Sequence, residues 1–337
     1  MPTERFPLPG IAHRLSVSFS PYRHRDLTDV FAGATVSLRL RYRFEYALAW
    51  VLMKLVGAMP RPVARAMGIT IAGIVYLLHR KLRRVGARNL ELAFPEKSET
   101  ERKKILRGVF WSLGRQLGEV CLFPRYRRES LPKTVVYEGF ENFERASVRG
   151  KGVLFLTAHL GAWELSAFAH SLYGYPLNIV MRPLDNPYLD RLVRAYRTMH
   201  GNQTVDKDFA RGLIAAMRKG ETVGVLMDTN MIASQGVFVE FFGVRACTAS
   251  GLARVALKTD AAVVPGFTIW DRELKKYRLR FDPPLKLIRS GNHEEDVIGN
   301  TALFTTVLEH HIRRYPDQWL WVHRRWKTRP EGEPPLY

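Results

Sequence analysis

A histidine and a glutamate five residues apart are the best candidates for chemistry in this sequence. His159 and Glu164 lie in the segment KGVLFLTAHLGAWE, residues 151–164. The apolar run Val153–Thr157 predicts a buried strand, and residues 162–174 predict a helix. His159 therefore lies on the strand-to-helix turn and Glu164 in the first turns of the helix, so their side chains can converge. A histidine whose tautomer and orientation are fixed by a carboxylate is a general base.

A structural role for His159 is the alternative, because this spacing also arises by chance. On one continuous helix, residues five apart would point about 140° away from each other. The turn favours catalysis, since α/β folds place ligands beyond the carboxyl ends of their strands. Asp228 ends another predicted strand, residues 222–227, in the position where such enzymes carry functional carboxylates.

Arg182 follows a third short strand, residues 177–180, in the sequence MRPLDNP. An arginine on a loop after a strand suits a phosphate or an oxyanion. A salt bridge to Asp185 or Asp190 explains the same residue equally well.

Other common catalytic patterns are missing from the sequence. There is no G-x-S-x-G, and Ser250 in TASG lacks the first glycine of that motif. Cys247 is better explained as a small buried thiol than as a nucleophile. His310, His311 and His323 show no H-E-x-x-H spacing, so we expect no metal and no cofactor.

The charge of the chain limits its partners. Its 52 basic and 32 acidic residues give a formal charge of +20 and a pI near 10.2. Either nucleic acid or an anionic membrane surface fits this charge. Two unpatterned cysteines indicate a reducing compartment. The first ten residues contain prolines and no apolar core, so we expect no cleavable signal peptide.

Two apolar runs near the amino terminus have basic flanks. Tyr46–Met59 follows Arg43, and residues 66–78 precede a cluster of arginines and lysines at 80–84. Both runs are shorter than the ~20 residues of a simple membrane span. They fit interfacial or re-entrant helices, a single tilted span near residues 43–60, or two ordinary core helices.

The remaining elements alternate between strand and helix. After a capping box at Ser98 and Glu101 and a helix at 105–122, strands are expected at 135–137, 153–157, 177–180, 222–227, 262–267, 267–270 with 277–281, and 319–322. Helices are expected at 162–174, 188–200, 208–219, 249–258 and 300–315. This order predicts an α/β fold with a largely parallel mixed sheet flanked by helices, preceded by membrane-associated helices.

Four stretches of sequence resemble one enzyme family. HLGAWE, RPLDNP, the segment NLELAFPEKSETER and the ending WVHRRWKTRPEG are similar to the lipid A late acyltransferases, the lauroyl- and myristoyl-transferring enzymes of Gram-negative inner membranes. These enzymes belong to the lysophospholipid acyltransferase superfamily, whose signature is His-x4-Asp/Glu. The resemblance spans roughly residues 43–337. It implies a glycerolipid acyltransferase-like fold on the cytoplasmic face of the inner membrane.

The resemblance also implies roles for particular residues. His159 is the base and Glu164 its orienting carboxylate, Arg197 joins the site, and Asp228 is the acid that the family carries at this position. Arg324 and Arg325 are placed near a phosphorylated acceptor. Relatives often have DQ or DHD where this chain has Asp228-Thr229-Asn230, which puts a role for the two neighbours in doubt.

We therefore expect three regions: a basic arm at 1–42, a helical membrane-anchoring region at 43–132, and an α/β acyltransferase domain at 133–337. The enzyme would move an acyl chain from acyl carrier protein or acyl-CoA to a hydroxyl of a lipid A precursor. Because a thioester is already activated, a base and oxyanion donors suffice and no acyl-enzyme is needed.

Two alternatives remain for the function. The acceptor could be another membrane lipid, such as a lysophospholipid, a glycolipid or an ornithine-type lipid. In a different class, the tryptophans and arginines of QWLWVHRRWKTRP also suit a protein that binds single-stranded nucleic acid. The basic-flanked apolar runs argue against nucleic acid as a partner and favour an anionic membrane surface. Phe238, Phe241 and Phe242 fit either an acyl groove or the core.

Overall fold

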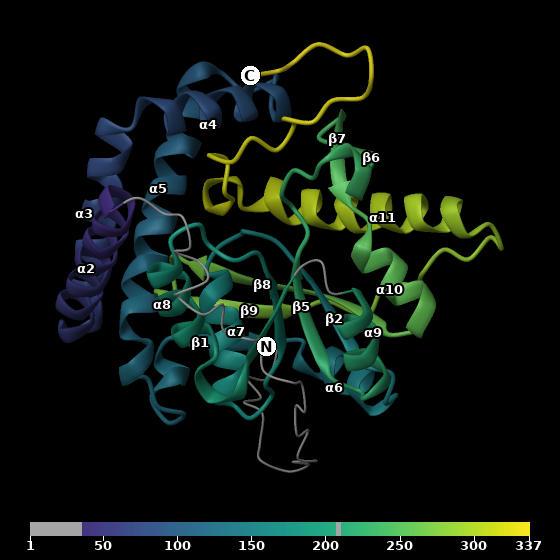
Figure 1. The fold of residues 1–337 in the computed structure, drawn as a ribbon, viewed down its shortest axis with the longest axis horizontal. Coiled ribbons are helices and arrows are strands. Elements are labelled where there is room, and N and C mark those ends of the chain that lie inside the picture. Colours follow the sequence, from purple (N-terminus) through teal and green to yellow (C-terminus); the bar gives the residue numbers. More distant parts are fainter. Residues whose placement is uncertain (1–35, 207–209) are drawn as a thin grey trace.

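A seven-stranded sheet lies at the centre of the structure, a computed structural model that describes residues 36–206 and 210–337. The strands, in spatial order, are β1 (Val135–Glu138), β9 (Lys276–Phe281), β8 (Ala262–Asp271), β2 (Val153–Thr157), β5 (Thr222–Leu226), β3 (Asn178–Met181) and β4 (Gln203–Asp206). Every neighbouring pair is parallel except β8 and β9, which are antiparallel. The predicted α/β fold with a largely parallel mixed sheet is confirmed (Figure 1).

Helices cover both faces of this sheet, and the central strand β2 shows why. Successive strand residues point to opposite faces. Val153 and Phe155 share a buried cluster with α6 (Phe140–Val148) and α7 (Trp163–Leu172). Leu154 and Leu156 share another with residues of α9, α10 and α11. These three helices span Ala210–Arg218, Gly251–Thr259 and His293–Arg314. An apolar run without alternation is therefore buried on both sides.

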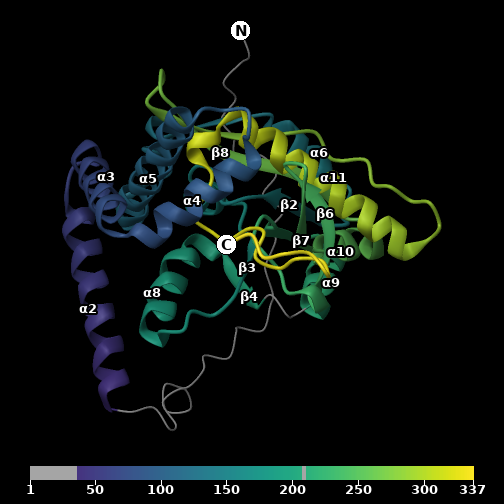
Figure 2. The same cartoon turned by 90° about the horizontal axis from the view of Figure 1, so that it is seen from above.

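From residue 36 onwards, where the description begins, four helices precede the sheet: α2 (Val36–Ala58), α3 (Arg61–Leu78), α4 (Arg80–Ala93) and α5 (Glu99–Leu122). The predicted capping box at the start of α5 is confirmed, since Ser98 and Glu101 bond each other's backbone amides. In both views α2 and α3 lie on the outer side of α5 (Figures 1 and 2). Residues 1–35 of the expected basic arm lie outside the described residues, and 36–42 begin α2.

Apolar side chains cover the outer surfaces of α2 and α3. On α2 most of the exposed large apolar residues recur every three or four positions, at Val36, Leu40, Phe44, Leu48, Val51 and Leu55, and Trp50 is exposed as well. This period places the recurring residues on one face of the helix. Over the described residues, α3 is the helix that is long and apolar enough to cross a membrane by length and composition.

Some expected elements differ from the structure. The expected strand at 319–322 is wrong: a single bridge joins Trp319 to Leu160, and the Trp321 amide folds back onto the Trp319 carbonyl across 2.8 Å. Sequence analysis also missed α6, β4 and a hairpin of β6 (Gly236–Phe241) and β7 (Val244–Ala249). Helix α11 begins seven residues earlier than expected, because Asn292 caps it by accepting from the amide of Glu295.

Candidate active site

His159 and Asp228 meet at the carboxyl ends of two neighbouring strands. Strand β2 pairs with β5 in a register that sets Thr157 opposite Leu226, so the residues two positions further on also lie side by side. Nδ1 of His159 lies 2.8 Å from Oδ1 of Asp228, and the His159 amide donates to Oδ2 across 2.8 Å. Asp228 is 2 % exposed, and the His159 side chain is partly exposed.

The charges of this pair stabilise each other. Burial alone would lower the pKa of His159, but the Asp228 carboxylate raises it above its ordinary value. Burial would raise the pKa of Asp228, yet His159 and the hydrogen bonds to the carboxyl group hold it below its usual range. An ionised carboxylate can only accept, so Nδ1 carries the proton and Nε2 has a free lone pair. This tautomer is the one that a general base requires.

Glu164 has a different partner from the one expected. Its carboxylate binds the guanidinium of Arg197 on α8 (Pro187–Arg197), with Nε 2.9 Å from Oε2 and Nη2 in contact with Oε1. The indole of Trp163 donates to the same carboxylate across 3.1 Å. The expectation that Glu164 orients His159 by a hydrogen bond is corrected, because Asp228 occupies that position. Glu164 still raises the pKa of His159 through its charge.

Trp319 completes the surroundings of Asp228, and sequence analysis did not find this role. Its indole Nε1 donates to Oδ2 of Asp228 across 2.7 Å. The backbone around Trp319 also holds the His159 turn: the Leu320 amide donates to the His159 carbonyl across 3.1 Å, and the Gly161 amide to the Gln318 carbonyl across 2.9 Å. The only sequence signal was the similarity of the C-terminal segment to the family.

Gly161 lets the His159 turn lie directly against strand β8. Its φ of +65° is in the left-handed region, and a Cβ atom here would overlap the carbonyl oxygen of Thr268. That carbonyl accepts the amide of Ala162 across 2.8 Å. A glycine is therefore required on both conformational and steric grounds.

The remaining predicted residues lie in different settings. Arg182 is exposed and pairs with Asp185 across 2.9 Å, so the salt bridge that the sequence allowed is present. Arg324 is exposed. Arg325 is 1 % exposed, and its guanidinium donates to the Cys247 carbonyl across 2.8 Å and contacts the Thr248 hydroxyl. The expected contact of Arg325 with a phosphorylated acceptor is corrected, because its side chain is enclosed by protein.

Asn230 links the Asp228 strand to the C-terminal segment. Its backbone amide donates to Nε2 of His323 across 3.1 Å. Its side-chain amide donates to the Thr328 hydroxyl and accepts from the Thr328 backbone amide. Asn230 therefore has a structural partner in this chain. Cys247 is fully buried, and burial raises the pKa of its thiol, which does not suit a nucleophile. Phe241 and Phe242 are buried among tryptophans in the core.

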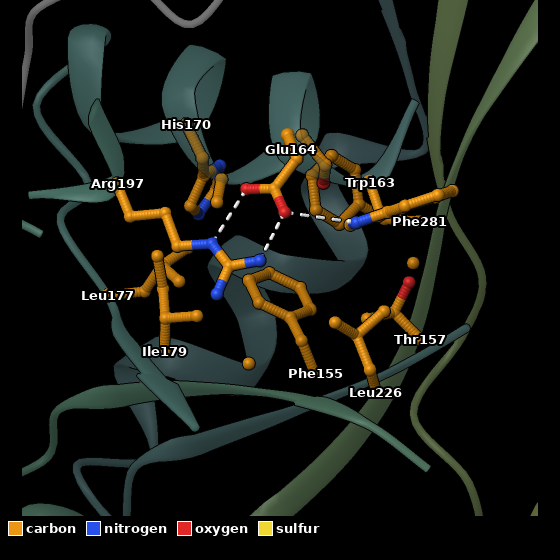
Figure 3. A pocket seen from close by; sticks show the side chains of 14 residues that line it. Phe155, Thr157, Trp163, Glu164, His170, Leu177, Ile179, Arg197, Leu226 and Phe281 are labelled. Carbon is orange, nitrogen blue, oxygen red and sulfur yellow. Dashed lines mark hydrogen bonds and ion pairs between the residues drawn. The ribbon is translucent and has the colours of Figure 1, made fainter. Parts of the chain in front are cut away.

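A cavity of about 50 Å³ opens next to the Glu164–Arg197 pair (Figure 3). Most of its wall is apolar and comes from strands β2, β3 and β5, the start of α7 and the end of β9. These apolar side chains include Phe155, Leu177, Ile179, Leu226 and Phe281. His170 also lines the cavity, and neither of its ring nitrogens has a hydrogen-bond partner among the described residues. Burial lowers the pKa of His170 to about 3, so the ring is neutral.

Comparison with known sequences assigns the chain to one enzyme family. The sequence profile of the family described as "Bacterial lipid A biosynthesis acyltransferase" matches residues 33–328. The chain belongs to this family. It is 30 % identical to the Escherichia coli lipid A biosynthesis lauroyltransferase over 87 % of this chain and 95 % of that one. It is 28 % identical to the E. coli palmitoleoyltransferase over 87 % and 93 %, and 25 % identical to the myristoyltransferase over 76 % and 78 %.

Membership confirms the predicted family and makes the chain an acyltransferase. The structure also removes the main support for nucleic-acid binding by this family member. Trp319, Trp321 and Trp326 are at most 2 % exposed, so their rings cannot stack on bases. Each indole N–H instead donates within the protein.

Proposed function

We propose that this enzyme acylates a hydroxyl of a lipid A precursor, with His159 as general base and Asp228 as its orienting carboxylate. The observation that carries the proposal is the contact between Nδ1 of His159 and Asp228, which leaves Nε2 free to accept a proton. Among the described residues Nε2 has no hydrogen-bond partner, and the side chain is partly exposed. The names of the relatives support lipid A as the acceptor.

The reaction needs one proton relay. Nε2 of His159 takes the proton of the acceptor hydroxyl as its oxygen attacks the thioester carbonyl, and the carbonyl electrons move to oxygen. When the tetrahedral oxyanion collapses, the C–S bond breaks and the leaving thiolate takes the proton from Nε2. The products are an ester and a free thiol. Asp228 stabilises the imidazolium while it exists, and no acyl-enzyme forms.

Arg197 and the neighbouring cavity supply the rest of the proposed site. The Arg197 guanidinium is held by Glu164 and lies close enough to His159 for its charge to affect the imidazole pKa. We place this fixed cation beside the developing oxyanion. The cavity walls are apolar, which suits the carbons of the acyl chain next to the reacting carbonyl, because a volume of about 50 Å³ holds only a few carbon atoms. Arg182 and Arg324, both exposed, remain candidates for contacts with the polar part of the acceptor.

The amino-terminal helices fit the cytoplasmic face of an inner membrane. The apolar face of α2 and the apolar helix α3 would enter the bilayer. Exposed Arg80, Lys81 and Arg84 at the start of α4 would lie among anionic headgroups or bind an acidic acyl carrier protein. On this proposal, residues 43–132 are the membrane-anchoring region and 133–337 the acyltransferase domain. The donor is an acyl carrier protein thioester or acyl-CoA.

A transfer assay with detergent-extracted protein tests the proposal. Labelled acyl carrier protein and acyl-CoA donors are each offered with a lipid A precursor or a lysophospholipid, using wild type, His159→Ala and the control His293→Ala. His293 is exposed at the start of α11, so its removal takes away a histidine without touching the site. We expect wild type and His293→Ala to form product on the lipid A precursor, and His159→Ala to form none. Product only on another lipid would replace the acceptor, and equal activity in His159→Ala would overturn the mechanism.

A further inference from the structure

A second cluster of polar side chains surrounds Trp270, and none of its members belongs to the His159–Asp228 pair. The guanidinium carbon of Arg65 on α3 lies 4.9 Å from the Trp270 ring centroid, and that of Arg115 on α5 lies 5.4 Å from it. The ring of Tyr277 on β9 packs edge-on against the same indole, with the centroids 5.0 Å apart. Helices α3 and α5 and the β8–β9 hairpin therefore bring hydrogen-bond donors together around the Trp270 ring.

Close packing of α3 and α5 brings the two arginines together. A Cβ atom on Gly118 would lie 2.7 Å from the Ala64 carbonyl oxygen and 2.9 Å from the Arg65 Cα atom. Gly68 and Gly114 face each other in the same way one turn along. Glycines at this crossing let the helix backbones touch, and the positively charged side chains of both helices then converge on Trp270.

These side chains have donors without acceptors. Nε and Nη1 of Arg65, Nε of Arg115 and the hydroxyl of Tyr277 are buried, and none has a hydrogen-bond partner among the described residues. Tyr277 is 2 % exposed. Burial lowers the pKa of Arg115, and the charge of Arg65 lowers it further. Burial raises the pKa of Tyr277, so its hydroxyl stays protonated and can donate. Leaving such groups unpaired is costly.

The carboxylates nearby already have partners. Glu119 binds Arg61 across 2.9 Å and also contacts the hydroxyl of Tyr126. Asp317 pairs with Arg272. Neither Arg65 nor Arg115 forms an ion pair within the part of the chain that the structure describes. The cluster therefore carries an excess of positive charge and of donors, which is the complement of an anion.

We propose that Arg65, Arg115 and Tyr277, with Trp270 as a wall, form a binding site for a phosphate ester. A phosphate group has several acceptor oxygens in a tetrahedral arrangement, which suits donors that arrive from three elements better than a planar carboxylate does. Arg65, Arg115 and Trp270 are each partly exposed, so the cluster borders the protein surface.

The Trp270 cluster lies near the proposed base His159, so a phosphate bound there could belong to a molecule that takes part in the reaction. Trp270 lies two residues beyond Thr268, whose carbonyl holds the Ala162 amide of the His159 turn. The site is therefore at the same end of the sheet as the proposed base, next to α3, which carries exposed apolar residues. The identity of the molecule that carries the phosphate depends on the proposed acyl transfer, whereas the existence of the site does not. This carrier is the lipid acceptor, the phosphopantetheine of the donor, or a phospholipid of the bilayer.

Phosphate binding is tested without reference to activity. Inorganic phosphate is titrated into the full-length protein in detergent at constant ionic strength, and tryptophan fluorescence and the melting temperature are followed. Phosphate is expected to change the fluorescence, and this change should be lost in Trp270→Phe. Arg65→Gln, Arg115→Gln and Tyr277→Phe should each weaken phosphate binding, the arginine variants by about tenfold or more.

Arg254→Gln is the matched control, because it removes one positive charge from an exposed salt bridge between Arg254 on α10 and Glu294 on α11. It should leave phosphate binding as in wild type. The melting temperature of Arg115→Gln in the absence of phosphate gives a second test. Removing an unpaired, partly buried cation in Arg115→Gln should keep or raise the melting temperature. A lower melting temperature together with unchanged phosphate binding would show that Arg115 only packs on Trp270, and would overturn the proposal.

Kinetics of Arg115→Gln then identify the carrier. If the acceptor is the carrier, the preference for a phosphorylated over a dephosphorylated acceptor falls by about tenfold. If the donor is the carrier, the preference for acyl-CoA over a short thioester without phosphate falls instead. If the bilayer is the carrier, the preference for phosphatidic acid vesicles over galactolipid vesicles falls. Wild-type values for all three preferences would contradict the proposal, whereas lack of transfer by wild type would contradict only the proposed function.

Discussion

Trp319 and Asp228 are joined by a hydrogen bond of 2.7 Å from the indole Nε1 to Oδ2, on the same carboxylate whose Oδ1 lies 2.8 Å from His159. The buried carboxylate thus accepts hydrogen bonds from the C-terminal segment and from the His159 turn at once. A rigid acceptor of this kind fixes the imidazole in one tautomer. In the proposed mechanism, Trp319 is therefore a positioning residue that acts through Asp228.

Replacing Trp319 by phenylalanine should separate positioning from packing. Trp319→Phe keeps a buried ring but removes the N–H, so we expect a loss of about 1 kcal/mol of unfolding free energy and a fall in kcat. Trp326→Phe is the control, because its indole is equally buried and donates to the Val244 carbonyl instead. Denaturant unfolding and turnover are measured for both. An equal fall in kcat for the two variants would refute the positioning role.

Asp228→Asn should alter the pH profile as well as the rate. The Asp228 carboxylate raises the pKa of His159, and a base must be neutral to accept a proton, so wild-type activity falls as pH drops through that raised pKa. Removing the carboxylate lowers the pKa, and the acid limb of the profile should move to lower pH. We also expect kcat to fall by about 10²- to 10⁴-fold. The exposed Asp260→Asn is the control, and an unmoved acid limb would argue against the pair.

Glu164 and Arg197 should act as one unit. Because the glutamate binds Arg197, Glu164→Ala and Arg197→Ala remove the same interaction. We expect each variant to lose most of its activity and the double variant to lose little more, which is strong non-additivity in kcat/KM. A larger effect on the acceptor KM would indicate binding, and an effect on kcat alone would indicate oxyanion stabilisation. Losses that multiply in the double variant would contradict the coupling.

Gly161→Ala tests the close approach of the catalytic turn to β8. The left-handed backbone alone should cost about 1 to 2 kcal/mol of unfolding free energy, and overlap with the Thr268 carbonyl should add to this. Gly150→Ala is a matched control, since its φ is +68° and a Cβ atom there meets nothing within 4 Å. If the two variants lose the same stability and both keep full activity, the contact with β8 is not required.

His170 should make the protein less stable in mild acid. Its pKa is about 3 in the folded state and 6.5 in the ordinary state, so between these values the unfolded chain binds the extra proton. Stability therefore rises with pH across this window, by about 1.4 kcal/mol per pH unit. Between pH 6.5 and 5 wild type should lose about 2 kcal/mol more unfolding free energy than His170→Phe. Parallel stability curves for the two proteins would exclude a buried neutral ring.

The strands around the site could be predicted because their apolar runs are local signals. Val153–Thr157 reads as a buried strand, and the structure has a strand with those bounds. The partner of His159 could not be found in this way, because Asp228 lies 69 residues further on. The two meet only because β5 is the neighbour of β2, and strand order is set by the packing of the whole sheet.

The burial of the C-terminal segment could not be predicted for a different reason. Trp319, Trp321 and Arg325 look like an exposed basic and aromatic surface, yet each finds a hydrogen-bond acceptor inside the protein. Amphipathic side chains of this kind are buried when their polar ends are paired. The sequence shows their composition but contains no local trace of the acceptors, which come from other elements.

The contact between the C-terminal segment and the His159 turn has a consequence for the order in which the chain folds. Trp319 lies 91 positions after Asp228, so this contact closes a long loop and is slow to form. The sheet can assemble from earlier residues, whereas the Asp228 carboxylate receives its indole hydrogen bond only when the last segment docks. A partly made or clipped chain that lacks the last segment would therefore keep the sheet but lose the indole hydrogen bond to the carboxylate that orients the proposed base.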